Sequence, residues 1–358
     1  MIKMRNLTRV AVLSAFMAVS TGAVAANWWP IVANETMPDG SIKQIEYVPQ
    51  EKASQAWPIC ISYPHLKDPF FLAANYGSVN EAKRLGVKIQ TMDAGGYTQL
   101  NTQISQIEDC VAGGAKAVVM VGVAADGMGN LLRSLAQKNV VVIDAVNGVK
   151  SDDVAARVLT NPREEAYNTG KYLAEKHPAG SPKVRVGWLP GPAGAGFVEA
   201  FSAGFHEGIK GSAVEIVETK YGDVGKEVQA RLVEDMIQTH KDLDYIVGTA
   251  VMAEAAVPLL KSRRLDDKIK LVSVYTTPGV YQHLKRGSIE AAGVAPVVDT
   301  ASLALDMAVR MLEAKEKQPI RVINTTSKVY TKDTIGNVDI SGTLAPADFR
   351  PVFSYDGK

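Results

Sequence analysis

The sequence predicts an α/β fold with two Rossmann-like lobes, each built on a parallel sheet. Short apolar strands alternate with helices along most of the chain, and this pattern restarts after a break near residues 158–162. The chain has 358 residues, more than the roughly 250–300 that one hydrophobic core usually accommodates. We therefore expect two lobes that meet at a cleft.

Residues 1–25 have the features of a secretory signal peptide. Lys3, Arg5 and Arg9 precede an apolar stretch at 10–19, and small residues of the A-x-A type follow at 23–25. The apolar stretch is too short to span a bilayer. We expect this segment to be removed on export, and an uncleaved anchor is the alternative.

Residues 26–52 form an arm ahead of the alternating pattern. The arm contains Trp28 and Trp29, three prolines and little helical periodicity. Two tryptophans are costly to leave in water, so we expect an ordered arm that packs on a lobe. Because aromatic residues also concentrate at interfaces, a docking arm for a partner protein is the alternative.

The first strand and the turn after it predict one wall of the cleft. An apolar strand at 59–63 is followed by a polar turn, and a helix begins at Pro69, where the missing N–H of proline costs nothing. Asp68 precedes that proline and is a good N-cap. In open α/β sheets, ligands bind at the carboxyl ends of parallel strands, which is where this turn lies.

The rest of the chain repeats the strand-to-helix unit. One segment, 116–121, is nearly all apolar, as a strand buried on both faces of a sheet should be. The predicted strands are 59–63, 87–92, 116–121, 140–144, 184–189, 214–219, 245–249, 271–275 and 289–294. The predicted helices are 70–85, 98–111, 128–137, 197–210, 226–240 and 301–315, with others between the last strands.

Composition and motifs argue against several classes of function. The chain has 39 basic and 38 acidic residues; without the three signal-peptide cations, 36 and 38 remain, a formal charge of −2. A nearly neutral surface argues against nucleic acid. There is no phosphate-loop motif, no nucleophile elbow, and the glycine-rich turn at 191–196 misses the dinucleotide-binding spacing. We expect no enzyme, no cofactor and no metal site, since two cysteines and five histidines offer no plausible zinc set.

The two cysteines occur in a chain that we expect to be exported, where a disulfide can persist. Cys60 lies in the first predicted strand and Cys110 at the end of the second predicted helix. A bridge between them is geometrically reasonable. Two buried free thiols are the alternative, because sequence alone does not fix the pairing.

The stretch Lys67-Asp-Pro-Phe-Phe71, with the helix at 75–86 behind it, resembles type I periplasmic binding proteins, the ribose-binding-like family. The resemblance covers about residues 52–318 and implies two lobes joined by three hinge strands. It implies an N-terminal lobe of residues 53–159 plus 296–323 and a C-terminal lobe of residues 160–295 plus 324–358.

Other blocks resemble a narrower group of this family, the periplasmic partners of a membrane sensor histidine kinase in a two-component system. The blocks lie at 61–68, 93–100, 106–110, 247–256, 284–287 and 349–352. This resemblance implies a periplasmic protein that binds trimethylamine N-oxide and regulates the kinase. A substrate-binding protein of an ABC importer for another small solute is the alternative.

The residues expected in the cleft suit a compact amine oxide better than a sugar. Where sugar-binding members carry a polar set, this chain has Glu199, Tyr275, Ala295 and either Thr249 or Ala250. A bound sugar would leave hydroxyls unpaired, at about 1–3 kcal/mol each. Aromatic faces attract a trimethylammonium-like group by about 0.5–2 kcal/mol per ring. The predicted ligand-binding residues are Tyr63, Asp68, Phe71, Tyr97, Asp144, Arg163, Trp188 and Tyr275. For the aromatic residues, packing inside a lobe is the alternative.

Arg163 departs from the pattern of the family, which implies an aromatic residue after the proline at the first crossing between lobes. An arginine directed into the cleft would repel a methylated cation and favour a carboxylate or phosphate. Trp188, near a strand end, would then supply the aromatic ring that the family pattern implies at position 163.

Overall fold

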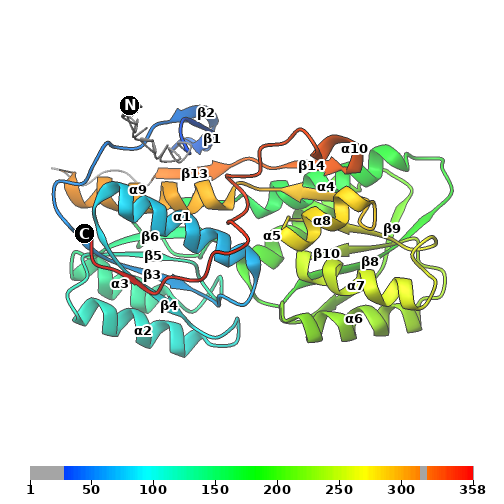
Figure 1. The fold of residues 1–358 in the computed structure, drawn as a ribbon, viewed down its shortest axis with the longest axis horizontal. Helices are drawn as coiled ribbons and strands as arrows, with labels where there is room; N and C mark the ends of the chain where they lie inside the picture. Colours follow the sequence, from blue (N-terminus) through cyan, green and yellow to red (C-terminus); the bar gives the residue numbers. More distant parts are fainter. Residues whose placement is uncertain (1–27, 315–320, 358) are drawn as a thin grey trace, which may run out of the picture.

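The computed structural model of the protein describes residues 28–314 and 321–357. Two lobes lie side by side along the long axis, each with a mainly parallel sheet between helices (Figure 1). The predicted two-lobed α/β fold is confirmed. The predicted signal peptide and the first two residues of the arm lie outside the described residues.

The N-terminal lobe is built on a nine-stranded sheet in the order β15-β4-β3-β5-β6-β7-β13-β1-β2. Its parallel strands are β3 (Pro58–Tyr63), β4 (Lys88–Asp93), β5 (Ala117–Met120), β6 (Val141–Val146), β7 (Ala156–Leu159) and β13 (Arg321–Thr325). Two separate apolar clusters cover the two faces of the sheet. The helices on one face are α1 (Pro69–Leu85) and α9 (Val297–Glu313), and those on the other are α2 (Leu100–Ala112) and α3 (Gly129–Gln137).

The C-terminal lobe has a six-stranded sheet in the order β14-β12-β11-β10-β8-β9. Its parallel strands are β8 (Val184–Gly191), β9 (Val214–Tyr221), β10 (Tyr245–Gly248), β11 (Lys270–Ser273) and β12 (Ala291–Val294), and β14 (Lys328–Thr331) is antiparallel. The helices are α4 (Pro162–Lys176), α5 (Gly196–Gly208), α6 (Lys226–Thr239), α7 (Ala250–Ser262), α8 (Pro278–Arg286) and α10 (Lys332–Ile335).

The chain crosses between the lobes four times: from β7 to α4, from β12 to α9, from β13 to β14, and once more after α10, when its end returns to the N-terminal lobe. At the first crossing Asn161 adopts a left-handed conformation with φ of 58°, and its side chain accepts a hydrogen bond from the backbone N–H of Glu164. Asparagine tolerates this conformation better than most residues, so the sharp turn into the second lobe has a local cause. The first three crossings follow the sequence order of a two-lobed hinge, in which a few residues between the lobes absorb the change in backbone angles.

Residues 324–358 are expected to belong to the C-terminal lobe, but the end of the chain leaves that lobe. After α10 it returns to the N-terminal lobe, where β15 (Ser354–Tyr355) pairs antiparallel with β4. The buried side chain of Asn75 holds this tail through Val352, accepting from its N–H at 2.8 Å and donating to its carbonyl at 3.2 Å. A buried amide left without these partners would be costly.

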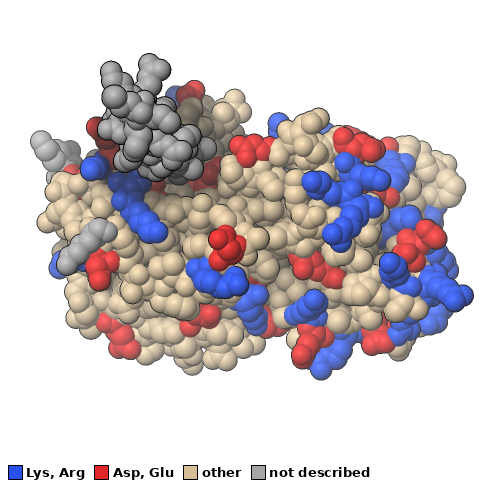
Figure 2. All heavy atoms as spheres, viewed as in Figure 1, with Lys and Arg blue, Asp and Glu red and all other residues tan. Residues whose placement is uncertain are grey.

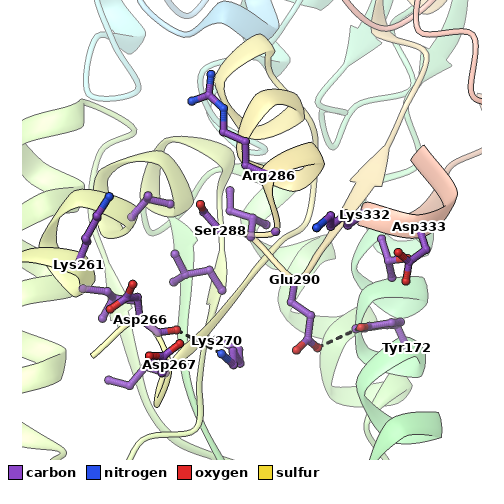
Figure 3. Close-up of a pocket in the computed structure, with 17 residues that line it drawn as sticks. Tyr172, Lys261, Asp266, Asp267, Lys270, Arg286, Ser288, Glu290, Lys332 and Asp333 are labelled. Atoms are coloured by element: carbon purple, nitrogen blue, oxygen red, sulfur yellow. Dashed lines mark hydrogen bonds between the residues drawn. The ribbon is translucent and has the colours of Figure 1, made fainter. Parts of the chain in front are cut away.

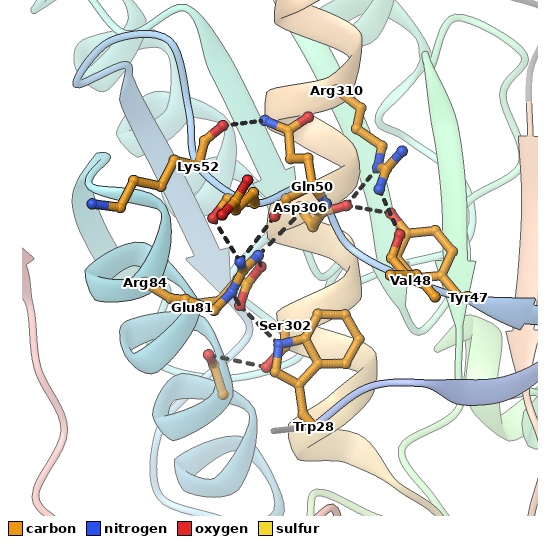
Figure 4. Close-up of polar contacts among 12 residues, drawn as sticks. Trp28, Tyr47, Val48, Gln50, Lys52, Glu81, Arg84, Ser302, Asp306 and Arg310 are labelled. Carbon is orange, nitrogen blue, oxygen red and sulfur yellow. Dashed lines mark hydrogen bonds and ion pairs between the residues drawn. The ribbon is translucent and has the colours of Figure 1, made fainter. Parts of the chain in front are cut away.

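The arm also packs on the N-terminal lobe (Figure 4). It forms a hairpin that extends the first sheet through β13, and its strands are β1 (Ile31–Thr36) and β2 (Ile42–Tyr47). The indole N–H of Trp28 donates to Glu81 on α1 at 2.8 Å, and the Tyr47 hydroxyl donates to Asp306, a fully buried residue on α9. The tryptophan and the tyrosine therefore anchor the arm through polar as well as apolar contacts.

Cys60 and Cys110 form a disulfide that joins β3 to α2, with their Cα atoms 6.4 Å apart. Within the described residues, no helix is long and apolar enough to cross a membrane. On the face shown in Figure 2, basic and acidic side chains are interspersed over the C-terminal lobe, in keeping with a formal charge close to zero.

Candidate functional site

A small cavity lies where the lobes meet, at the carboxyl ends of strands from both sheets. The void is about 30 Å³ in volume, so the lobes are closed on each other. The N-terminal lobe and the first crossing contribute Asp68, Phe70, Phe71, Tyr97, Val146, Asn147 and Thr160. The C-terminal lobe contributes Pro162, Glu165, Phe197, Phe201, Val224 and Tyr275. This is the position at which α/β sheets bind ligands.

Polar contacts cross from one lobe to the other around the cavity. The Tyr275 hydroxyl donates to Asp68 Oδ2 at 2.8 Å. Closer to solvent, Lys67 pairs with Asp223 at 2.6 Å. These contacts exist only while the lobes are closed, so they stabilise the closed arrangement.

Asp68 is the best-anchored acid of the site. It is the N-cap of α1, as predicted, and its Oδ1 accepts from the Phe70 N–H at 2.9 Å while Oδ2 accepts from Tyr275. Burial raises the pKa of Asp68 to about 6, and the two hydrogen bonds oppose that rise. Near neutral pH the carboxylate is therefore mostly ionised and placed at the cavity wall.

Aromatic rings from both lobes form most of the remaining wall. The Phe70 ring stands edge-on to Tyr275, with centroids 5.0 Å apart, and Tyr97 lies 5.3 Å from Phe197. The Tyr97 hydroxyl accepts a hydrogen bond from the Asn147 side chain at 3.2 Å, which leaves its own proton able to donate. Such a wall suits an apolar or cationic group with one hydrogen-bond acceptor.

Glu165 is a cavity residue that the sequence analysis missed. It lies in the first turns of α4, has 2% of its surface exposed, and its Oε1 has no hydrogen-bond partner among the described residues. Burial raises the pKa of Glu165 to about 8, while a hydrogen bond with Thr160 lowers it and Glu164 raises it. An acid early in a helix is ordinarily explained by the helix dipole, so the sequence carried no separate signal for this role.

Four predicted ligand residues line the cavity: Asp68, Phe71, Tyr97 and Tyr275. Tyr63 and Trp188 instead lie in the cores of their lobes. The Tyr63 hydroxyl shares a hydrogen bond of 3.1 Å with Ser78, and the Trp188 ring stacks on Phe205 with centroids 4.3 Å apart. Neither belongs to the cavity wall, and the rings that the C-terminal lobe contributes are Phe197, Phe201 and Tyr275.

Asp144 and Arg163 also lie outside the cavity wall. Asp144 accepts from Arg157 Nη1 at 2.6 Å and from the Val149 N–H at 3.0 Å, so it fixes the loop after β6. Arg163 is exposed and pairs with Glu207 on α5 at 2.6 Å. An arginine engaged there does not bring a positive charge into the cavity, and the expected preference for a carboxylate or phosphate loses its basis.

A larger hollow of about 470 Å³ lies on the C-terminal lobe, at the opposite edge of its sheet (Figure 3). Lys270 begins β11 there and Glu290 precedes β12, so the hollow is at the amino ends of these strands. Glu290 is already occupied by the Tyr172 hydroxyl at 3.0 Å and by Lys176 at 2.7 Å. The inter-lobe cavity is therefore the better candidate for the ligand site. Nowhere in residues 28–314 and 321–357 do three or more metal-ligating side chains gather in a way that would hold an ion.

The known proteins to which this chain is similar are binding proteins of the periplasm. A family model described as a periplasmic binding protein domain matches residues 59–316. The periplasmic protein TorT of Escherichia coli K12 is 34% identical over 304 residues, which cover 85% of this chain and 86% of TorT.

Two solved structures are similar over nearly their whole length. An ABC transporter solute binding protein from Bradyrhizobium sp. BTAi1, with bound bis-tris, is 47% identical with a TM-score of 0.79, covering 92% of this chain and 99% of that one. TorT in complex with the TorS sensor domain, in the presence of TMAO, is 35% identical with a TM-score of 0.74, covering 83% of this chain and 100% of that one. The chain therefore belongs to the type I periplasmic binding protein family, and within it to the group of TorT.

Proposed function

We propose that this periplasmic binding protein senses trimethylamine N-oxide, or a close relative of it, and regulates the periplasmic domain of a membrane sensor histidine kinase. The observation that carries the proposal is the chemistry of the inter-lobe cavity. Its wall combines aromatic rings with two buried carboxyl groups, Asp68 and Glu165, and has no lysine, arginine or histidine among the described lining residues. The similarity to TorT over 85% of the chain supports the partner.

The cavity offers a partner for each end of an amine oxide. The methylated nitrogen carries a positive charge, which aromatic faces and carboxylates attract. The oxygen carries a negative charge, and the free proton of the Tyr97 hydroxyl can donate to it. A sugar with several hydroxyls finds few partners on a wall made largely of rings.

Ligand binding would reach the kinase through the hinge. A ligand held by residues of both lobes favours the closed arrangement, and closure changes which surfaces of the two lobes lie next to each other. A kinase domain that contacts both lobes would then bind the two arrangements with different affinity. That difference is what shifts a kinase between its states.

An ABC importer component is the second candidate. The specific observation in its favour is the relative from Bradyrhizobium, which is 47% identical and is described as an ABC transporter solute binding protein. That relative has bound bis-tris, which is a tertiary amine. A nitrogen bonded to three carbon atoms is thus common to bis-tris and trimethylamine N-oxide, and the two candidates differ in the partner rather than in the class of ligand.

Two measurements test the proposal. Calorimetric titration of the mature protein, in buffers free of amines, should show saturable binding of trimethylamine N-oxide and no binding of ribose or acetate. Reconstitution with the sensor kinase encoded nearest to this gene should then show ligand-dependent autophosphorylation. Binding of acetate alone, or a kinase that ignores the loaded protein, would contradict it, and a permease encoded in place of the kinase would favour the importer.

A further inference from the structure

We propose that Glu165 selects the ligand's charge: the cavity binds a ligand with a net positive charge by exchanging it for the proton that Glu165 holds when the cavity is empty. The inference rests on the proposed function, because it concerns the same cavity. It extends that function by naming the residue that reads the charge and by coupling the binding of a cation to the release of one proton.

Glu165 is a buried acid, and one of its carboxyl oxygens has no hydrogen-bond partner among the described residues. That oxygen is Oε1, and the side chain that carries it lines the cavity. Asp68, the other acid of the cavity, has a donor on each oxygen. A buried carboxylate without a compensating charge is unfavourable, so Glu165 takes up a proton when nothing else is bound.

Among the described residues, no group that lines the cavity with Glu165 neutralises it. The titratable groups that share the cavity wall are Asp68 ahead of α1, Tyr97 before α2 and Tyr275 after β11, none of them a cation. On its own helix, Glu164 raises the pKa of Glu165, which reaches about 8 mainly through burial. The neighbouring helix α5 contributes two residues to the described wall, Phe197 and Phe201, and neither is charged.

A methylated ammonium group supplies the missing charge without supplying a hydrogen bond. Its methyl groups pack on the rings of Phe70, Phe197 and Tyr275, while its charge favours the ionised carboxylate. When such a cation binds, the proton of Glu165 leaves for solvent, so charge balances within the cavity. An amine oxide is neutral overall and displaces no full proton; its nitrogen side faces Glu165 and its oxygen accepts from Tyr97.

The test uses tetramethylammonium, whose charge does not depend on pH, and tert-butanol as a neutral probe of similar shape. Because one proton leaves per cation bound, affinity for tetramethylammonium should rise about tenfold per pH unit from about pH 6.5, where Asp68 is already ionised, up to pH 8, and level off above it. Affinity for tert-butanol should not rise in this way. Titrations in phosphate, cacodylate and borate avoid a competing buffer amine.

Glu165→Gln keeps the shape of the side chain and removes its charge. We expect this variant to lose the pH dependence and at least tenfold in affinity for tetramethylammonium at pH 8, with its affinity for tert-butanol unchanged. Glu175→Gln, on the exposed end of the same helix, is the matched control and should behave as wild type. A thermal melt shows that each variant is folded.

The proposal is overturned if wild-type affinity for tetramethylammonium does not change with pH, or if Glu165→Gln binds the cation as tightly as wild type. The outcome is separate from that of the proposed function. Cation binding with the pH slope but no response to trimethylamine N-oxide would retain Glu165 and remove the named ligand. Binding of trimethylamine N-oxide with a kinase response but no slope for the cation would do the reverse.

Discussion

At the scale of single residues, the site depends on which face of a strand each side chain occupies. Tyr97 and Tyr275 lie in loops after strands and reach the cavity. Tyr63 and Trp188 lie within strands, where successive side chains point to opposite faces, and both point into lobe cores. A strand end can be predicted from the sequence to within a residue or two, but a shift of one residue exchanges core for cavity.

Glu165 gives a prediction about pH and stability. Its pKa in the folded protein is raised by burial to about 8 from an ordinary 4.5, so the folded state holds a proton that the unfolded chain loses. Stability from this group is therefore complete at low pH and is lost as pH rises toward 8. Without ligand, Glu165→Gln should unfold like wild type near pH 5 but be more stable at pH 9, by an amount on the order of 4 kcal/mol.

Denaturant titrations of both proteins across this pH range measure the difference directly. Other buried acids, such as Asp68 and Asp299, whose pKa values burial also raises, are present in both proteins and largely cancel. A difference in unfolding free energy that stays the same from pH 5 to pH 9 would show that Glu165 is not protonated in the folded state.

At the scale of elements, apolar periodicity found the strands and helices whose packing is apolar. It missed α4, and the reason is the way α4 packs on α5. A Cβ atom added to Gly204 would lie 2.0 Å from the carbonyl oxygen of Arg163, and one added to Gly170 would lie 2.8 Å from that of Phe205. On α4 the face toward α5 carries Gly170 where a large apolar residue would otherwise mark the helix, whereas α5 keeps Phe201 and Phe205 and is predicted from the sequence.

The disulfide between β3 and α2 gives a second prediction. It closes a loop of 50 residues, and constraint of the unfolded chain by such a loop is worth about 4 kcal/mol in the chain-entropy model. The double variant Cys60→Ala/Cys110→Ala should therefore lose stability of that order in urea unfolding. A thiol assay of the native wild type should find no reactive cysteine, and two reactive thiols would contradict the pairing.

At the scale of the whole molecule, closure is the property on which sensing depends. The Tyr275 hydroxyl joins the lobes through Asp68, and its removal leaves a buried carboxylate oxygen without a donor. Such a loss costs about 1.5–3 kcal/mol, which makes the closed arrangement less populated. We expect Tyr275→Phe to bind ligand about 10- to 100-fold more weakly.

Calorimetry measures the affinity, and small-angle scattering with and without ligand measures closure. Tyr172→Phe is the matched control, because its hydroxyl binds Glu290 within one lobe and Tyr172 does not line the inter-lobe cavity. If Tyr275→Phe closed on ligand with wild-type affinity, the hydrogen bond between the lobes would have no part in closure.

The arm and the tail both fasten to the N-terminal lobe, one through Trp28 and Tyr47 and the other through Asn75. The covalent connections of the C-terminal lobe to the rest of the protein are the three hinge crossings and the tail that leaves it after α10. A surface, a label or a partner protein attached near either described end holds the N-terminal lobe and leaves the C-terminal lobe free to move. Immobilisation through the tail should accordingly leave ligand binding intact, whereas a tether placed on the C-terminal lobe would restrain the part that moves.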